Sequence, residues 1–186
     1  MPEDDRIHVM DEADVRQAVA RMAGEIVERA GGTDRLVLMG IHRRGTQIAA
    51  MLREEIARTE GVRVASGSID ITLYRDDLET IGPRPVVGGS ELPPEGLDGQ
   101  DVVIVDDVAY TGRTARAALN ELNDWGRPRR TLLCVLVDRG GRELPIQPDV
   151  TGTSVHVLPN QRVEVLVPEL DERLGVDLIN MGAGAS

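Results

Sequence analysis

Short apolar runs alternate with amphipathic stretches along most of the chain, and this alternation constrains the fold more than any other feature. Apolar side chains at helical spacing predict helices over 11–30, 46–58 and 114–125. Apolar or alternating runs predict strands at 36–39, 69–74, 102–105 and 131–137. Strands that alternate with helices favour an α/β fold with a mostly parallel central sheet. We therefore predict a single domain over 1–186, with its ligand site at the carboxyl ends of the strands.

Two regions depart from this alternation. The stretch from Arg75 to Gln100 is rich in Pro and Gly and has no regular period, so we expect a functional flap over about 75–100. Apolar runs at 155–158 and 163–167 predict strands of a smaller C-terminal element.

Charge and cysteine content narrow the class of protein. The formal net charge is −11, and all 21 basic residues are Arg, so a uniformly basic nucleic-acid binder is excluded while a local basic patch is not. Cys134 is the only cysteine and sits in an apolar run, which predicts a buried structural thiol. The acidic, polar start of the chain is unlike a signal peptide, and no apolar run is long enough to span a membrane. We expect a cytoplasmic protein.

The segment Val102–Thr114, VVIVDDVAYTGRT, carries the chemistry. An apolar strand delivers Asp106 and Asp107 at its end, and a turn containing Gly112 leads directly into a helix. The free N–H groups and positive dipole end of that helix suit a phosphate, whereas carboxylates suit sugar hydroxyls. This arrangement predicts a ribose 5-phosphate site; the simpler alternative is a strand, turn and capped helix with exposed acids. It lacks the Lys of a Walker loop and the spacing of a GxGxxG fingerprint.

The same string closely resembles the PRPP-binding motif of type I phosphoribosyltransferases. Three further segments are similar to the PyrR family, bifunctional pyrimidine-operon regulators with uracil phosphoribosyltransferase activity: GIHRRG (40–45), IDITLYRDDL (69–78) and VLVDRGGRELPI (135–146). The resemblance covers nearly the whole chain. It implies the type I phosphoribosyltransferase fold, an α/β sheet flanked by helices with a small C-terminal hood and a flexible flap.

The resemblance also implies roles for residues of the motif. Asp106 and Asp107 would hold the ribose hydroxyls of PRPP, and Ala109–Thr114 its 5-phosphate. The whole motif is thereby expected to contribute to PRPP and UMP binding: Val102, Val103, Ile104, Val105, Asp106, Asp107, Val108, Ala109, Tyr110, Thr111, Gly112, Arg113 and Thr114.

Outside the motif, the resemblance implies contacts to pyrophosphate and base. His42, Arg43 and Arg44 match the loop that grips pyrophosphate, which in this superfamily often holds a non-proline cis peptide. Two Arg residues between glycines at a strand end independently predict a multidentate anion clamp. Arg75 and Arg84 of the flap would close over the pyrophosphate, and Arg139 and Val163 would face the base.

The implied reaction converts uracil and PRPP to UMP and pyrophosphate, with Mg²⁺ carried by PRPP rather than by direct protein ligands. Asp106, Asp107 and Arg44 are the expected catalytic residues. No residue stands out as a general base, and since uracil N1 is already fairly acidic, positioning suffices for the chemistry.

Family members also bind pyrimidine-operon leader mRNA when UMP is present, and so promote transcription termination. Candidate RNA contacts are the arginines Arg21, Arg29, Arg127, Arg129, Arg130 and Arg142. The chain departs from the family pattern at Ala20, Gly24, Gly141 and Gln147, where hydroxyl, His or basic residues are common.

Three alternatives remain open at this point. The chain could be a salvage enzyme that has lost RNA regulation, a non-catalytic sensor of UMP or PRPP, or a transferase for a purine base. The resemblance further implies a homo-oligomer, a dimer or a higher assembly.

Overall fold

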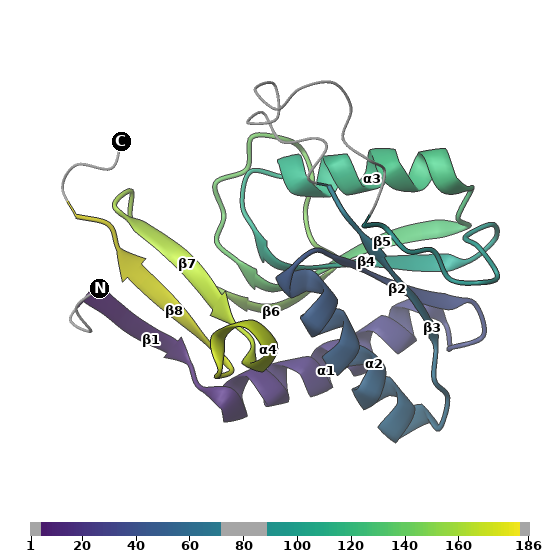
Figure 1. Cartoon of the computed structure of the whole chain (residues 1–186), viewed down its shortest axis with the longest axis horizontal. Coiled ribbons are helices and arrows are strands. Elements are labelled where there is room, and N and C mark those ends of the chain that lie inside the picture. The colour runs from purple at the N-terminus through teal and green to yellow at the C-terminus, as the bar shows by residue number, and fades with distance from the viewer. Residues whose placement is uncertain (1–4, 72–88, 183–186) are drawn as a thin grey trace.

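Two sheets organise the computed structural model, which describes residues 5–71 and 89–182. The larger sheet has five strands in the order β3-β2-β4-β5-β6, and every neighbouring pair is parallel. Its strands are β2 (Leu36–Ile41), β3 (Ala65–Ile69), β4 (Asp101–Ala109), β5 (Arg130–Asp138) and β6 (Val150–Ser154). Helices α1 (Glu12–Ala30) and α2 (Arg44–Glu60) cover one face, and α3 (Arg113–Trp125) covers the other (Figure 1). The predicted α/β fold is confirmed.

Burial on both faces explains the uninterrupted apolar run of β4. Val103 and Val105 pack in the cluster under α1 and α2, whereas Val102 and Ile104 pack in the cluster under α3. These side chains are at most 1% exposed. The buried thiol of Cys134 in β5 belongs to the first cluster, as predicted.

Helix boundaries follow local signals in the sequence. The Asp11 side chain accepts a hydrogen bond from the Asp14 N–H, and the Asp14 side chain accepts one from the Asp11 N–H, so a capping box starts α1. Gly31, at φ 73°, ends it. Helix α2 begins at Arg44 rather than at Thr46, and Gly45 is buried in its first turn.

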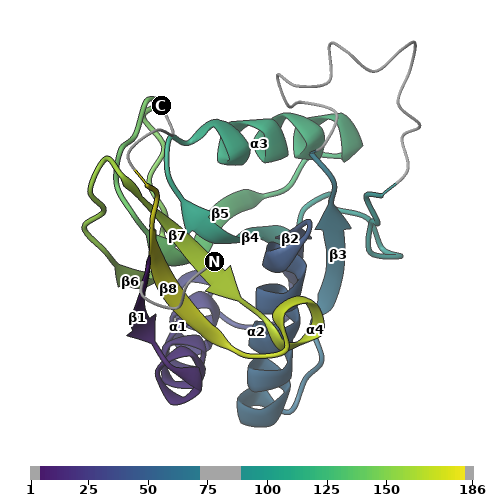
Figure 2. The ribbon, with the colours of Figure 1, turned by 60° about the vertical axis from the view of Figure 1, so that its left-hand side comes forward.

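The smaller sheet, which we call the hood, joins the two ends of the chain. It consists of β1 (Arg6–Met10), β8 (Gly175–Asn180) and β7 (Gln161–Leu166) in that antiparallel order, with the short helix α4 (Pro168–Asp171) between β7 and β8. Figure 2 shows the hood in front of the larger sheet, with α4 beside α2. The predicted strand at 163–167 is confirmed within a residue or two, but β1 and β8 were not predicted.

Two predicted strands differ from the observed ones. Residues 155–158 form no strand; instead β6 precedes them and belongs to the larger sheet, where it pairs with β5. Of the strand predicted at 69–74, Asp70 and Ile71 are not in a strand and residues 72–74 lie outside the described residues; the observed strand is β3, which ends at Ile69. Its Ser-Gly-Ser centre has low strand propensity, and the parallel pairing with β2 overrides that preference.

The expected flap is described only in part. Arg75 and Arg84 lie outside the described residues, as does everything from 72 to 88. Within 89–100 the chain runs in turns, with a single antiparallel bridge between Glu91 and Ser68 of β3. Among the described helices, none is long and apolar enough to cross a membrane.

The order of the larger sheet creates a crevice at its carboxyl edge. Strands β2 and β4 are neighbours, but the chain continues from β2 to β3 on one side and from β4 to β5 on the other. The loops that follow β2 and β4 therefore diverge, and ligands of parallel α/β sheets bind at such a point.

Candidate functional site

A cleft of about 600 Å³ opens at this edge of the sheet. Its walls come from the ends of β2 and β4, the start of α2, the residues after β3 and the start of α3: Ile41, His42, Arg43, Arg44, Asp70, Ile71, Asp106, Asp107, Val108 and Thr114. A smaller cavity of about 110 Å³ shares the lining residues Asp106, Val108 and Thr114 with it, so the two cavities adjoin.

The paired acids stand where β4 runs past the end of β2. The last β2–β4 pair is Gly40 with Val105, whereas β4 continues to pair with β5 as far as Ala109. Asp106 and Asp107 therefore project over a sheet edge that β2 does not cover. The Asp106 carboxylate accepts a hydrogen bond from the Asp107 N–H, and the Asp107 carboxylate accepts one from the Val108 N–H, both at 2.8 Å.

Burial at the strand end and the neighbouring charge of Asp107 raise the pKa of Asp106 well above its ordinary value. Asp106 therefore retains a proton more readily than an isolated aspartate does. A ligand that offers hydroxyl donors to its carboxyl oxygens would favour the ionised form of Asp106.

The small cavity lies over the start of α3. Gly112 precedes the helix at φ 92°, a left-handed conformation that favours glycine, and a Cβ there would lie 3.3 Å from Leu144 Cβ. Gly112 has no side chain to cap the helix, Thr111 Oγ1 accepts a hydrogen bond from the Arg113 N–H at 3.2 Å, and no acid occupies the first turn. The other N–H groups of the first turn lie beside the cavity that Thr111 and Thr114 line, an arrangement that suits a phosphate.

The loop after β2 forms the opposite wall. The peptide bond between His42 and Arg43 is cis, as the resemblance implied. Gly45 lets α2 approach β4 closely, because a Cβ there would lie 2.6 Å from the Val105 carbonyl oxygen. The imidazole Nε2 of His42 lies 3.1 Å from Ser68 Oγ and 3.0 Å from the Gly89 carbonyl, which connects this loop to the segment after residue 88.

The two arginines of this loop have different surroundings. Arg43 is exposed, and its side chain has no hydrogen-bond or ion-pair partner within residues 5–71 and 89–182. Arg44 is bound by Asp171 of α4, with Nη2 to Oδ1 at 2.8 Å and Nε to Oδ2 at 3.3 Å. Arg43 is thus available to an anion, whereas Arg44 is anchored to the hood.

Comparisons with known proteins agree with this geometry. Residues 9–172 match the family model of the phosphoribosyl transferase domain. The bifunctional protein PyrR of Herpetosiphon aurantiacus is 52% identical over 163 residues, covering 88% of this chain and 90% of that protein. The PyrR protein of Thermus aquaticus is 50% identical over 173 residues, covering 93% and 95%.

This chain belongs to the PyrR family of phosphoribosyltransferases.

Solved structures agree on the fold. A hypoxanthine phosphoribosyltransferase from Staphylococcus aureus superposes with a TM-score of 0.72 at 17% identity, over 98% of this chain and 96% of that one. The enzyme from Trypanosoma cruzi gives 0.72 at 20% identity, over 94% and 95%. At such identities the likeness shows the type I fold alone.

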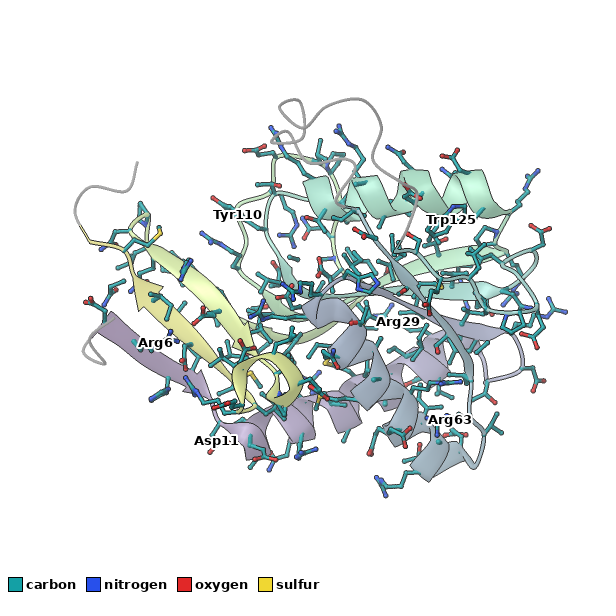
Figure 3. All side chains as sticks on the ribbon, in the orientation of Figure 1. Arg6, Asp11, Arg29, Arg63, Tyr110 and Trp125 are labelled. Atoms are coloured by element: carbon teal, nitrogen blue, oxygen red, sulfur yellow. The ribbon has the colours of Figure 1, made fainter. Side chains whose placement is uncertain are left out.

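The two residues that the PyrR resemblance assigns to the base, Arg139 and Val163, line neither of the two cavities described above. Arg139 stacks on the ring of Tyr110, 3.8 Å from its centroid, and Tyr110 lies beside the start of α3 on the side of the hood (Figure 3). Val163 lies in β7, packs on the main core cluster and is not among the residues that line the two cavities described above. The apolar part of the motif, Val102–Val105, is buried, so it contributes by placing the acids rather than by contact.

Asp70 and Ile71 line the cleft of this PyrR-family chain but were not singled out from the sequence. An acid between two isoleucines at a strand end was the available signal. Asp171, which anchors Arg44, carried no local signal because the contact spans 127 positions.

Five of the six arginines expected to contact RNA have partners within the chain. Arg21 donates to carbonyls of β6, Arg29 pairs with Glu25, and Arg129 binds the buried Asp101 through two bonds. Arg130 donates to the Arg29 carbonyl, so Arg29, Arg129 and Arg130 gather at one end of the larger sheet. Arg127 is the sixth, an exposed side chain with no partner in the described part of the chain.

Arg142 is the clearest departure from this expectation. Its side chain is only 12% exposed, pairs with Asp138 and donates to the carbonyls of Tyr110 and Ile146. It holds the loop after β5 against the turn that precedes α3, which is a structural role.

Proposed function

We propose that this PyrR-family chain transfers the phosphoribosyl group of PRPP to uracil, giving UMP and pyrophosphate. The observation that carries the proposal is a pair of adjoining cavities at the carboxyl edge of the sheet, lined by the start of α3, a pair of carboxylates and an arginine-bearing loop. These three features match the 5-phosphate, the ribose and the pyrophosphate of a single substrate. Family membership supports the same assignment.

The geometry suggests how the residues act. The N–H groups at the start of α3, with Thr111 and Thr114, bind the 5-phosphate and fix the sugar in the cleft. Asp106 and Asp107 accept hydrogen bonds from the ribose hydroxyls. When the bond from C1 to pyrophosphate breaks, positive charge develops on the ring, and these carboxylates stabilise it electrostatically.

Arginines stabilise the opposite charge, which develops on the leaving group. Within residues 5–71 and 89–182 the Arg43 guanidinium has no partner, and Arg43 and Arg44 both line the cleft. Uracil N1 attacks C1 from the side of the ring opposite the departing pyrophosphate, and the N1 proton passes to water, with no dedicated base because N1 is already fairly acidic. Positioning of the two substrates therefore supplies most of the rate enhancement.

The donor set fits a magnesium ion that arrives with PRPP. Within the described residues no cluster of three or more acidic, His or Cys side chains could hold a metal ion. Asp106 and Asp107 are the acids that would face it, and oxygen donors suit Mg²⁺. When bound, the ion neutralises charge on the pyrophosphate.

Measurements of UMP synthesis test both the choice of base and the roles of the cleft residues. Purified protein should convert uracil and PRPP to UMP, with hypoxanthine and guanine as the competing bases. The variant Asp107→Asn with Arg44→Ala should lose turnover while its melting curve stays cooperative, because both changes lie at the open cleft. Undiminished UMP formation by that variant would overturn the assignment of roles, and preference for a purine would overturn the choice of base.

We further propose that the second function of the chain is UMP-dependent binding of pyrimidine-operon leader mRNA. Family membership favours it, since the relatives carry the name bifunctional. The cluster of Arg29, Arg129 and Arg130 beside exposed Arg127 is the strongest candidate surface. Titration of leader RNA with and without UMP tests it; robust UMP synthesis with no UMP-enhanced RNA binding supports a salvage enzyme alone.

We also propose that the chain acts in the cytoplasm as a homo-oligomer. PRPP is a multiply charged anion, so an enzyme that uses it must share its compartment. Exposed apolar side chains such as Ile7 on the edge strand β1, 47% exposed, offer surface for self-association. Sedimentation or light scattering would give the mass, and a monomer at micromolar concentration would contradict the proposal.

A further inference from the structure

The contact between Arg44 and Asp171 joins the hood to the pyrophosphate side of the cleft. Arg44 stands at the start of α2 and Asp171 at the end of α4, and the two side chains are 33% and 15% exposed. Both oxygens of Asp171 are engaged by the guanidinium. A bidentate pair of this kind fixes orientation as well as distance.

Contacts other than the one with Arg44 also hold the Asp171 carboxylate in place. Its Oδ2 accepts a hydrogen bond from the Val167 N–H at 2.9 Å, and its own N–H donates to the Val167 carbonyl at 2.8 Å. Burial opposes ionisation of this acid, but hydrogen bonds from Arg44 and from Val167 together hold its pKa below the ordinary value. Asp171 therefore presents a fixed negative charge from the turn that follows β7.

A guanidinium offers two edges that can each bind an oxyanion through two donors. In Arg44 the edge formed by Nε and Nη2 is occupied by Asp171. Nη1 has no partner among residues 5–71 and 89–182, and Arg44 lines the cleft that contains Asp107. The remaining edge, Nη1 with the second hydrogen of Nη2, is therefore available to a ligand.

We propose that Asp171 is a positioning residue, which fixes the Arg44 guanidinium so that its free edge meets the pyrophosphate group of PRPP. The inference rests on the proposed function and extends it, because it gives the hood a part in binding the leaving group. The two arginines then bind pyrophosphate in different ways. Arg43 is free to move toward the anion, whereas Arg44 is held in the orientation that binds it.

The variant Asp171→Asn tests this proposal. Asn keeps the size of the side chain and can still accept from the Val167 N–H, but it loses the charge and the paired contact with Arg44. We expect the KM for PRPP, and the inhibition constant of inorganic pyrophosphate, to rise about 10-fold, the scale of a lost charge-assisted contact. The KM for uracil should change less than about twofold, because uracil does not touch this arginine. Unchanged PRPP binding, or an equal change for both substrates, overturns the proposal.

Two controls separate positioning from a purely structural link. Glu169→Gln removes an exposed acid from the same helix and should leave both KM values unchanged. In an Arg44→Lys background, Asp171→Asn should have little further effect on the KM for PRPP, because Asp171 acts through the guanidinium edge. A full additional loss in that background would show that Asp171 supports the hood alone.

The measurement also separates failure of this proposal from failure of the proposed function. If the unaltered chain makes no UMP, the proposed function fails, whereas calorimetric titration with PRPP or inorganic pyrophosphate still compares the variants. If Asp171→Asn does not melt cooperatively, Asp171→Glu takes its place. Glu keeps the charge but displaces it by one methylene, so we expect PRPP to bind about threefold more weakly; unaltered binding would overturn the proposal.

Discussion

The acids of the cleft and the acids of the hood differ in what surrounds them. Asp106 and Asp107 accept hydrogen bonds from backbone N–H groups, and within the described residues no arginine pairs with either. Asp177 in β8 is 0% exposed and accepts from Arg6 and His8 at 3.2 and 2.8 Å, and also from Arg173. Within the described residues, the aspartates of the cleft therefore have no paired cation, whereas the aspartate of the hood has three hydrogen-bonding partners that can carry positive charge.

This difference shifts their pKa values in opposite directions. Burial and a like charge raise the pKa of Asp106, whereas at Asp177 burial is outweighed by hydrogen bonds from His8, Arg173 and Arg6, which lower its pKa. A buried acid with cationic partners stabilises the fold it sits in. A half-buried acid pair without paired cations costs stability, and such a cost is typical of a site kept for a ligand.

Loss of both cleft charges should have the largest effect. We expect Asp106→Asn with Asp107→Asn to lower kcat/KM by on the order of 10³-fold, since two preorganised carboxylates that face the reacting sugar are removed. Steady-state UMP synthesis measures it. A decrease smaller than about 10-fold would place these acids outside the reaction.

Loss of the hood charge should act on stability instead. We expect Asp177→Asn to lower the free energy of unfolding by about 2 kcal/mol, because it leaves Arg6 and Arg173 without their buried partner. Urea melts at pH 7 measure this loss, and kcat/KM at low temperature should stay within about twofold. If Asp177→Asn lowered kcat/KM and left the free energy of unfolding unchanged, the acids of the hood and of the cleft would not differ in role as proposed.

The pH dependence of that loss has a definite sign. The folded state holds the pKa of Asp177 below its ordinary value of 3.8, so the stabilisation is present above that pH and disappears as pH falls through the lowered value. Urea melts of the two proteins should therefore converge at acidic pH.

The same contrast explains how much of the molecule the sequence could predict. The site after β4 could be predicted because strand, acids, glycine and helix start are consecutive, and each carries a local signal. The hood could not, because β1 and β8 lie at opposite ends of the chain and pair only in the folded state. Their short polar-apolar runs carry little information until a partner strand fixes one face.

The roles of individual arginines also depend on partners that are distant in the sequence. The carbonyls of Tyr110 and Ile146 bind the guanidinium of Arg142, and Asp171 in the hood binds that of Arg44. These contacts decide whether each arginine is available to a ligand. An arginine in a sequence shows its charge but not its partner. Expectations of free cations, as at five of the six RNA candidates, are therefore the ones that the fold revises most.

In contrast to Asp177→Asn in the hood, the single cleft substitution Asp106→Asn should raise the stability of the fold. The folded state raises the pKa of Asp106, so between the ordinary value of 3.8 and that raised value the folded chain binds more protons than the unfolded one. The free energy of unfolding consequently falls as pH rises through this window. Asp106→Asn removes that penalty, and we expect a gain of about 1 kcal/mol at pH 7 together with lost activity. Urea melts at pH 4 and pH 7 check it; a variant less stable than the unaltered chain at pH 7 would contradict it.

The smallest effect should come from an ion pair that resembles the hood pairs in chemistry but not in burial. Arg16 donates to Glu12 at 2.8 Å on the exposed face of α1, with the two side chains 59% and 61% exposed. Water screens this pair and both side chains stay mobile, so Glu12→Gln should cost about 0.3 kcal/mol or less and leave kcat/KM unchanged. Urea melts of this variant beside Asp177→Asn therefore compare pairing with burial. If the two losses were equal, pairing alone would set the stabilisation, and the contrast between hood and cleft would lose its physical basis.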